Sequence, residues 1–599
     1  MSELRDMLDH FQQYRQANAP LPGTMSLWPL YGAGFDNLGL DGRPIDVPVP
    51  AYGADELLVR HDACGLCFSD IKVIRLGEEH PRIYRDMQAD PVVLGHEVIM
   101  TVVGVGDNLR DQYRVGDRFI VQADIYVDGM NLAYGYEIQG GLSQYNVIDQ
   151  RVLNGDDGNY LIPVQPDTGY AESALTEPWA CVIAAYQLKY RTTLKPGGTT
   201  WIIGASATLS TDASAALPPS PLYTISAGFD ENSHPARLLL TDVPANFANW
   251  LKRRAETLGV EVIKVDDVTA PIPLPSPSWG GAGGGVDDII LLGADPDLIE
   301  AVSPRLADFG LLAIVADKPL PRKVKVDIGC VHYNSWLYVG GPGPDVARAY
   351  SDVPVRSTLK PGGRAWFVGA GGPMGRMHVQ RAIQVTTGPS TILCTDISDL
   401  RLDDLRASFA AEAQARSIEF ICLNPMDEEA YAAGMAPFKK RGFDDVVVLA
   451  PVPAVISDAA TYLAPQGVMN VFAGVARGTM AQVDLSDVYL KGARIIGHSA
   501  STIDDLRLML HQAESGRLSP NRSVAAVGSL SAARDGLQAV KDTVFPGKIV
   551  IYPHIKDFPL TSLPDLQDKL PSVYAKLKDG REWTVEAEEE FLRLMLRGE

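Results

Sequence analysis

The sequence has few cysteines, no long apolar run and no excess of positive charge. Six cysteines among 599 residues are too few for a disulfide framework. No run of about 18 apolar residues is present, which excludes a membrane-spanning helix. The 74 acidic residues outnumber the 53 basic ones, and the net charge of −21 argues against nucleic acid or an anionic membrane as a partner. Because the N-terminus is polar and does not resemble a signal peptide, we expect a soluble cytoplasmic protein.

What the sequence does contain is a long internal repeat. The hexapeptide TLKPGG occurs at 193–198 and again at 358–363, and each copy leads into an apolar segment, TTWIIGAS or RAWFVGAG. The same order of apolar strand, polar turn and helix-period segment follows in both copies, with GVDD in one and GFDD in the other. Continuous β-rich runs that alternate with helices are typical of a parallel sheet covered on both faces. We therefore predict two tandem, doubly wound α/β domains of Rossmann type, at 188–352 and 353–500.

The second copy carries a glycine-rich loop between its first strand and its first helix. The loop and the start of the helix contain Gly369, Gly371, Gly372, Pro373, Met374 and Gly375. Glycines let the backbone approach a pyrophosphate, whose charge is stabilised at the helix N-terminus. Asp396 ends the next strand about 20 residues later, where a carboxylate hydrogen-bonds the ribose hydroxyls and repels a 2′-phosphate. The pattern predicts NAD in preference to NADP, although Ala370 departs from GxGxxG; Gly474, after a later strand, is a further candidate for the cofactor site.

The first copy lacks such a loop. After Gly204 no glycine occurs until Gly228, and two adjacent prolines interrupt the segment where the helix would begin. Proline inside a helix removes a hydrogen bond and clashes with the preceding turn. A Pro- and Gly-rich stretch at 271–285 is a further insertion, while Asp242 keeps the position that corresponds to Asp396. We predict a degenerate Rossmann-like domain that has kept its fold and lost its nucleotide; a second active cofactor site is the alternative.

Three motifs upstream of the repeats carry the candidate chemistry. They are GLCFSD within HDACGLCFSDIKV (61–73), GHE within VVLGHEV (92–98) and EP within ALTEPWACVIAAY (174–186). In this order, and ahead of the glycine-rich loop, they resemble the medium-chain zinc-dependent dehydrogenases of the alcohol and sorbitol dehydrogenase type. The resemblance covers about 45–200 and 353–555. Within that family, segments such as EPWACVIAAYQLKY and GFDDVVVLAP resemble those of polyol dehydrogenases of the L-sorbose-1-phosphate reductase type.

The resemblance implies the remaining architecture and a reaction. A GroES-like β-barrel catalytic domain would span 1–187 and be completed by 501–555, which contains the returning strand. The charged tail at 556–599 is helical in period and has no counterpart in the family, so we expect a C-terminal helical extension. The implied reaction is hydride transfer between NAD(H) and a secondary alcohol or ketone, such as a polyol, sugar or sugar phosphate. Two alternatives stay open: a dehydrogenase of simple alcohols, and a non-catalytic scaffold that only binds the cofactor.

The resemblance also implies one catalytic zinc ion. Cys67 would be its thiolate ligand and His96 its imidazole ligand, with Glu97 as a direct or near ligand and Glu177 in the place of a second cysteine. A catalytic zinc needs about three protein ligands and an open position for water or substrate. Family members with a second, structural zinc carry four closely spaced cysteines, and residues 98–180 contain none. The alternative for Glu177 is an acid that stabilises a helix N-terminus.

Ser69 and Lys72 are the residues implied for proton transfer. Ser69 would lie beside the substrate oxygen, and Lys72 stands where the family's proton relay has a histidine. Glu177 is a further catalytic candidate. Nearby, His80, Arg82 and Arg85 are either ligands of a substrate phosphate or part of a solvated loop.

The edges of the two predicted sheets raise the question of a partner. In the family, the last strand of the Rossmann sheet pairs with a second subunit, which implies a homodimer. An exposed sheet edge calls for a partner or a cover. The first copy retains VHYNSWLYVGG (331–341), and the second has KGARIIGHS (491–499). The alternative is an intramolecular pseudo-dimer, in which the strand at 495–497 lies beside that at 336–340 of the same chain.

Overall fold

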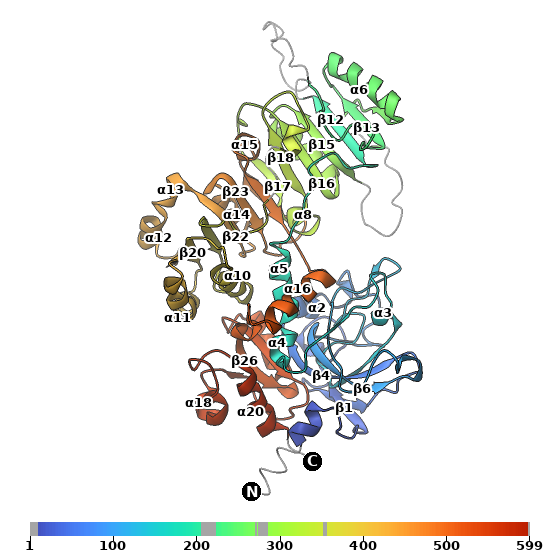
Figure 1. Ribbon diagram of the computed structural model, residues 1–599, viewed down its shortest axis with the longest axis vertical. Coiled ribbons are helices and arrows are strands. Elements are labelled where there is room, and N and C mark those ends of the chain that lie inside the picture. The colour runs from blue at the N-terminus through green and yellow to red at the C-terminus, as the bar shows by residue number, and fades with distance from the viewer. Residues whose placement is uncertain (1–9, 205–222, 270–271, 273–284, 352–355, 597–599) are drawn as a thin grey trace. The chain divides into compact units, whose positions relative to one another are not determined.

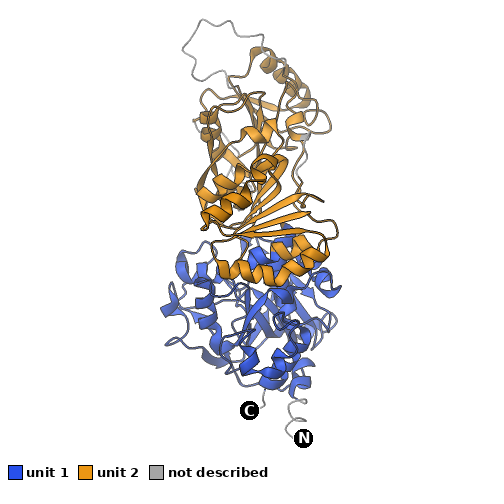
Figure 2. Ribbon diagram, turned by 90° about the vertical axis from the view of Figure 1, so that its left-hand side faces the viewer, with its two compact units in different colours: residues 1–184, 372–377, 500–599 blue, residues 185–371, 378–499 orange. Residues whose placement is uncertain are grey.

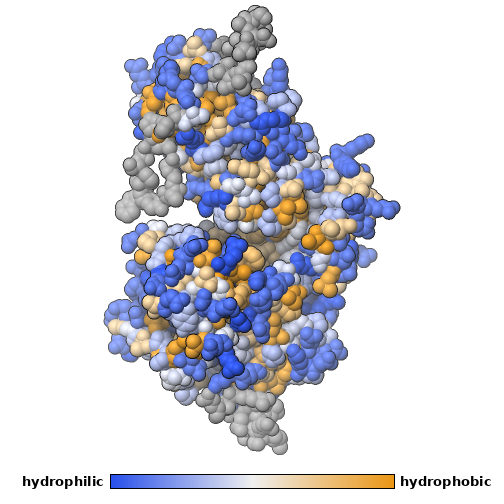
Figure 3. All heavy atoms as spheres, turned by 180° about the vertical axis from the view of Figure 1, so that it is seen from behind, coloured by the Kyte–Doolittle hydropathy of each residue, from blue (hydrophilic) through white to orange (hydrophobic). Residues whose placement is uncertain are grey.

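The structure, a computed structural model (Figure 1), describes most of the chain: residues 10–204, 223–269, 272, 285–351 and 356–596. The chain divides into two compact units (Figure 2), one of residues 1–184, 372–377 and 500–599 and the other of residues 185–371 and 378–499. Among the residues described, every helix is too short or too polar to cross a lipid bilayer. Polar side chains dominate the face seen in Figure 3, and apolar side chains form scattered patches on it.

The first unit is built on an eight-stranded sheet that combines early and late segments of the sequence (Figure 1). Its order is β11-β7-β6-β4-β27-β26-β28, and β10 also pairs with β4. The strands are β4 (Leu57–Gly65), β6 (Glu97–Val105), β7 (Arg118–Val121), β10 (Tyr145–Ile148), β11 (Leu161–Pro163), β26 (Val524–Ser529), β27 (Lys548–Tyr552) and β28 (Thr561–Ser562). All residues of β4 are buried, which indicates that both faces of the sheet are covered at this strand. One neighbour is β27, so the predicted return of the chain to this domain is present.

The C-terminal tail belongs to the first unit. Its last helix, α20 (Val585–Met595), carries the buried Glu588. The Glu588 carboxylate accepts hydrogen bonds from the backbone N–H groups of Tyr170 (2.5 Å) and Ala171 (2.7 Å) and from the hydroxyl of Tyr552 (2.7 Å). Tyr170 and Ala171 begin α4 (Tyr170–Ala174), and the first N–H groups of a helix have no partner within it. The tail therefore caps a helix of the first unit, a role that its sequence did not suggest.

The second unit contains two six-stranded parallel sheets with the same strand order. The first sheet, β14-β13-β12-β15-β16-β18, consists of β12 (Thr199–Gly204), β13 (Arg237–Thr241), β14 (Glu261–Lys264), β15 (Val286–Leu292), β16 (Leu306–Val315) and β18 (Leu337–Gly341). The second sheet, β21-β20-β19-β22-β23-β25, consists of β19 (Arg364–Val368), β20 (Thr391–Thr395), β21 (Glu419–Leu423), β22 (Phe443–Val448), β23 (Leu463–Val471) and β25 (Arg494–Gly497). This is the order of a doubly wound dinucleotide-binding fold, which confirms the two predicted Rossmann-like sheets.

The predicted degeneracy of the first copy falls largely outside the described residues. The segment after β12, where the phosphate loop and helix would lie, is 205–222, and most of the Pro- and Gly-rich insertion is 273–284. The described helices of this copy include α6 (Ala245–Leu258) and α7 (Pro296–Val302), whereas the second copy has α10 (Pro373–Gln384), α11 (Asp399–Ala415) and α14 (Pro453–Ala460). The loss of the first nucleotide site therefore stays a prediction.

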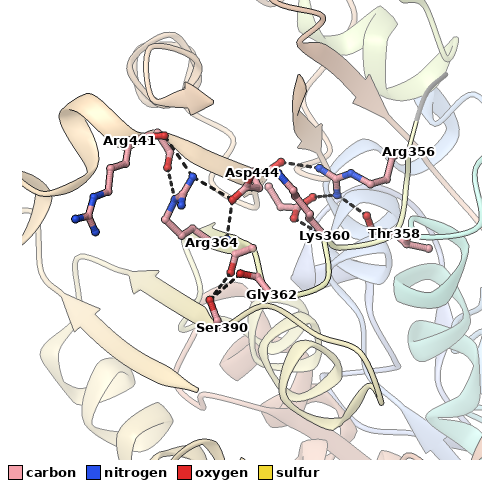
Figure 4. A network of polar contacts seen from close by, with 11 residues as sticks. Arg356, Thr358, Lys360, Gly362, Arg364, Ser390, Arg441 and Asp444 are labelled. Carbon is pink, nitrogen blue, oxygen red and sulfur yellow. Dashed lines mark hydrogen bonds and ion pairs between the residues drawn. The ribbon is translucent and has the colours of Figure 1, made fainter. Parts of the chain in front are cut away.

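The repeated TLKPGG ties the first strand of each sheet to its neighbour. In the second copy, the backbone N–H of Lys360 donates to Asp445 (2.8 Å), and the Lys360 ammonium group donates to Asp444 (2.6 Å; Figure 4). The N–H of Arg364, the first residue of β19, donates to the other oxygen of Asp444 (3.0 Å). Arg356 also pairs with Asp445. Both aspartates lie on β22, beside β19, so the motif fixes where the chain enters the sheet.

The first copy repeats these contacts. The backbone N–H of Lys195 donates to Asp288 (2.8 Å), and the Lys195 ammonium group donates to Asp287 (2.5 Å). The N–H of Thr199 donates to Asp287 (2.8 Å), and Arg191 pairs with Asp288 (3.0 Å). Asp288 is fully buried, and a buried carboxylate needs hydrogen bonds and a cation. TLKPGG and the later DD pair thus form one hydrogen-bonded structural motif, which is present once in each sheet.

The last strands of the two sheets lie side by side in the same chain. β18 and β25 are in contact, which confirms the predicted juxtaposition of 336–340 with 495–497. They end separate sheets, however, and the hydrogen-bonded ladder between the two copies is formed by β17 (Val324–Asp327) and β24 (Met480–Val483). A single apolar core contains residues of both copies, among them Tyr338 and Ile495.

Candidate metal and cofactor sites

Three of the predicted metal ligands converge in the first unit. Cys67 immediately precedes α2 (Phe68–Leu76), His96 immediately precedes β6, and Glu97 is the first residue of β6. One ligand atom of each side chain lies within 4.8 Å of the other two. Gly95 has a φ of 103°, and a Cβ atom there would lie 2.6 Å from the sulfur of Cys64, so this turn into the site requires glycine.

Asp70 connects two of these ligands. Its carboxylate accepts a hydrogen bond from the backbone N–H of Cys67 (2.9 Å) and lies 3.3 Å from Nδ1 of His96. Burial lowers the pKa of His96, but the charges of Asp70 and Cys67 outweigh burial and hold that pKa well above its usual value. The site therefore favours positive charge. Asp70 was missed as a site residue, although its place at the third position of α2 marks it as a helix-capping acid.

Glu97 is held by a buried lysine from the far end of the chain. The Lys548 ammonium group, on β27, lies 2.5 Å from Oε1 of Glu97, and both side chains are buried. The other carboxylate oxygen, Oε2, is buried and has no hydrogen-bond partner in the part of the chain that the structure describes. That oxygen is available to a cation. Nothing in the local sequence marks Lys548, which only the pairing of β27 with β4 brings to the site.

Glu177 lies in the first turn of α5 (Thr176–Ala184). It is not part of the compact group formed by Cys67, His96 and Glu97. Burial raises the pKa of Glu177 to about 7, with the charge of His96 lowering it and that of Glu97 raising it. The role of Glu177 as fourth ligand or as acid–base residue stays a prediction.

Ser69 and Lys72 both lie on α2, three residues apart and therefore on one side of the helix. Burial, together with the charges of Arg82 and Lys72, lowers the pKa of His80 to about 4. The His80 ring packs on Tyr136 (centroids 5.3 Å apart), which in turn packs on His96 (6.1 Å). A neutral His80 thus lies one aromatic ring away from His96.

The two arginines considered for a substrate phosphate already have carboxylate partners. Arg82 pairs with Asp124 (2.5 Å). Arg85 pairs with Asp90 (2.9 Å) and Glu137 (3.2 Å). These pairs favour a structural role in the loop, and the contact of these arginines with a phosphate stays untested.

The donor set of the first unit fits a zinc ion. A thiolate, an imidazole and a carboxylate are the ligand types of catalytic zinc sites, which need about three protein ligands. A bound cation would give the unpartnered Oε2 of Glu97 a partner. It would also supply positive charge near His96, where the charges of Asp70 and Cys67 favour it. Cys67, His96 and Glu97 are therefore the residues that would hold the metal.

The glycine-rich loop lies against the end of β20, the strand that Asp396 follows. The backbone N–H groups of Gly369 (2.8 Å) and Ala370 (2.9 Å) donate to the carbonyl of Thr395. The N–H of Gly371 donates to Oδ2 of Asp396 (2.9 Å), and a Cβ atom on Gly371 would lie 2.9 Å from the same oxygen. Loop and carboxylate thus meet at the carboxyl edge of the second sheet, where a dinucleotide would bind.

The other residues predicted for the cofactor site lie at the start of the next helix or after a later strand of the same sheet. Gly372 is partly exposed, and Pro373, Met374 and Gly375 form the first turn of α10. Gly474 is an exposed residue shortly after β23, on the same edge of the sheet. Their contact with a cofactor stays a prediction.

The chain is similar to known dehydrogenases. Residues 53–154 match the alcohol dehydrogenase GroES-like domain. The mannitol-1-phosphate 5-dehydrogenase of Aliivibrio fischeri is 29% identical over 318 residues, with 49% of this chain and 70% of that protein covered. An uncharacterized protein of Escherichia coli, YggP, is 30% identical over 316 residues with the same coverage. The L-sorbose 1-phosphate reductase of Klebsiella pneumoniae is 27% identical over 299 residues, with 49% of this chain and 71% of that protein covered.

These similarities agree with the geometry of the site. The matched GroES-like segment contains Cys67, His96 and Glu97. About half of the chain is enough to cover more than two thirds of each relative, so this chain is longer than they are. The chain belongs to the zinc-type medium-chain dehydrogenase family, which comprises alcohol and polyol dehydrogenases.

Proposed function

We propose that this protein is a zinc-dependent oxidoreductase that transfers a hydride between NAD(H) and a secondary alcohol or ketone. The convergence of Cys67, His96 and Glu97 carries the proposal, since these are ligand types of catalytic zinc. Two relatives are named for mannitol 1-phosphate and L-sorbose 1-phosphate. The proposed substrate is therefore a polyol, a sugar or a sugar phosphate.

The residues around the metal site would keep its ligands oriented. When bound, zinc would polarise the substrate oxygen and ease hydride loss or gain at the adjacent carbon. Asp70 lies 3.3 Å from Nδ1 of His96, so Nε2 would be the nitrogen available to hold the metal. Lys548 holds Oε1 of Glu97 and leaves Oε2 unpaired. Each contact lowers the cost of bringing a ligand into place.

The proton that accompanies the hydride would travel along α2. In the reductive direction, a ketone gains a hydride from NADH at carbon and a proton at oxygen. The Ser69 hydroxyl would give that proton and regain one from the Lys72 ammonium group; oxidation of the alcohol reverses both transfers. The position of these residues on one side of α2 supports this route. Glu177 is the alternative acid or base.

NAD is proposed in preference to NADP. Asp396 offers a carboxylate beside the glycine turn, where a 2′-hydroxyl can donate to it and a 2′-phosphate would be repelled. Ile397 and Met426, which are 71% and 73% exposed, follow the ends of β20 and β21. Their apolar side chains are suited to contact the adenine ring.

Replacing Asp396 with serine should lower the preference for NAD⁺ over NADP⁺, measured as the ratio of kcat/KM values, about tenfold or more. The reason is the loss of charge-assisted hydrogen bonds, worth about 1.5–3 kcal/mol, together with the repulsion of the 2′-phosphate. Asp403→Ser is the control, because that exposed aspartate of α11 pairs with Arg406. An unchanged protein that already prefers NADP⁺ would contradict the assignment.

A substrate panel tests the proposed function. The zinc-loaded protein is incubated with NAD⁺ and hexitols, hexitol phosphates or simple secondary alcohols, and NADH absorbance is followed. Turnover of a hexitol or its phosphate above the simple alcohols is expected. Turnover of simple alcohols alone would contradict the proposed substrate class. NAD⁺ binding without turnover of any alcohol, or of the matching ketones with NADH, would favour the non-catalytic scaffold.

A further inference from the structure

The ladder between the two copies has the symmetry of a dimer interface. VKVD (324–327) and AQVD (481–484) occupy equivalent positions in the two repeats, so Lys325 corresponds to Gln482. In the antiparallel pair of β17 and β24, Lys325 lies opposite Gln482 itself. An equivalent pair at the centre of an antiparallel ladder is the mark of a local two-fold axis. In two-fold interfaces the same patch is used on both sides.

The flanking pairs obey the same rule. Val324 lies opposite Val483, and Val326 lies opposite Ala481. Val324 corresponds to Ala481, and Val326 corresponds to Val483. Exchanging the two copies therefore turns each of these pairs into the other. All four side chains are buried, while Lys325 and Gln482 are exposed. The two strands thus face the core and the solvent in the same alternation.

A second set of contacts, far from this ladder in sequence, is also reciprocal. Gly340 of the first copy corresponds to Gly497 of the second, and His332 corresponds to Tyr489. A Cβ atom on Gly340 would lie 2.6 Å from Cβ of Tyr489, and one on Gly497 would lie 2.8 Å from Cα of His332. In each copy, therefore, a glycine of the last strand packs against a helix of the other copy. Gly340 packs against α15 (Ser486–Leu490), and Gly497 packs against α8 (Ile328–Tyr333).

From these contacts we infer that the first Rossmann-like copy serves the second as a built-in partner subunit. It covers the β25 edge from within the chain, an edge that would otherwise be open to another molecule. The shared core that contains Tyr338 and Ile495 makes this contact a permanent one. The inference does not depend on the proposed reaction or on whether the first copy binds a nucleotide.

An engineered disulfide at the symmetry axis tests the inference. Lys325→Cys and Gln482→Cys are combined in the full chain and treated with oxidised glutathione, so that two thiols form one disulfide and two molecules of reduced glutathione are released. Directly opposite residues of an antiparallel pair have Cα atoms about 4.5–5.5 Å apart, within the range of a disulfide. We expect a cross-link within one chain, seen as a monomer of altered mobility in a non-reducing denaturing gel. The single variant Lys325→Cys and the unchanged protein are the controls.

The result that overturns the inference is a cross-link between two chains, or the absence of any cross-link while both thiols react with a soluble thiol reagent. Hydrogen exchange of the unchanged protein gives a second measurement. In the described residues, β17 is the ladder partner of β24, so the amides of 480–483 should be protected to the same degree at all protein concentrations. Protection that falls on dilution would assign the partner strand to another molecule and would also overturn the inference.

Discussion

Replacing Cys67 with alanine should remove the bound zinc and lower turnover about 10³-fold or more, while the protein still folds. Loss of a metal that stabilises transition-state charge costs several kcal/mol, and each 1.36 kcal/mol is a factor of ten in rate. Cys67 is only partly buried and stands at the N-terminal end of α2, so alanine removes a ligand without opening a large cavity. Metal content by mass spectrometry, turnover and circular dichroism of the same sample measure the three outcomes.

Cys64→Ala is the matched control for this prediction. Cys64 is the other cysteine of the CxxC sequence, but it is fully buried and is not part of the group formed by Cys67, His96 and Glu97. This variant should keep its zinc and its activity, with a modest loss of stability from the missing thiol. If Cys67→Ala retains full zinc and turnover, or if Cys64→Ala loses zinc to the same degree, the ligand assignment is wrong.

Replacing Lys548 with methionine should lower the free energy of unfolding of the metal-free protein by about 3–5 kcal/mol at neutral pH. The variant leaves the Glu97 carboxylate buried without its cation, and breaking a buried ion pair from one side costs about that much. In the zinc-loaded protein the loss should be smaller, because the ion supplies positive charge close to the same carboxylate. Urea unfolding with and without a chelator measures the difference.

The sign of the pH dependence supports a measurement at neutral pH. Burial lowers the pKa of Lys548, but the charges of Glu97 and Cys67 outweigh it and raise that pKa above its usual value. A raised pKa in the folded state means that the stabilisation is fully present below the unfolded pKa of about 10.4 and is lost only as the pH rises further. Neutral pH therefore samples the whole contribution.

Two variants separate the lost ion pair from other effects. In the double variant Lys548→Met/Glu97→Gln the buried charge is gone, so much of the stability should return. Lys578→Met breaks a lysine–glutamate pair of the same unit whose lysine is 63% exposed, and it should cost at most about 1 kcal/mol. Equal losses in Lys548→Met and Lys578→Met would refute the view that Lys548 supports the metal site.

Local patterns in the sequence were enough to predict the parallel sheets and to single out three residues that the structure brings together. Cys67, His96 and Glu97 stand in short motifs, and their convergence follows from the family's fold. The strands of both sheets were visible as buried β-rich runs, because a strand covered on both faces must be apolar throughout. Asp396 was placed correctly beside the glycine turn, since the carboxyl ends of adjacent parallel strands meet at one edge.

Other features of the protein depend on contacts between distant segments. Lys548 meets Glu97 across 451 residues, and Glu588 caps α4 across 418. A lysine or glutamate has the same local signal whether it is buried or exposed, so no sequence pattern distinguishes these two from the many others. The strand pairing of β27 with β4 and the packing of α20 against α4 decide which of them are buried.

The internal repeat shows most clearly which features the local sequence reveals and which depend on contacts between distant segments. By itself the sequence determined that two copies exist, because TLKPGG and the DD pair each occur twice. In each copy the motif and the pair are hydrogen-bonded to each other and together position the first strand of the sheet. Only the tertiary structure decided that the two copies face each other across the reciprocal contacts of β17 with β24. The physical reason is that a strand's pattern of buried and exposed residues records which face it buries, but not which strand lies at its edge. Backbone hydrogen bonds at that edge are alike for every partner, and the fold of the whole chain determines which partner is present.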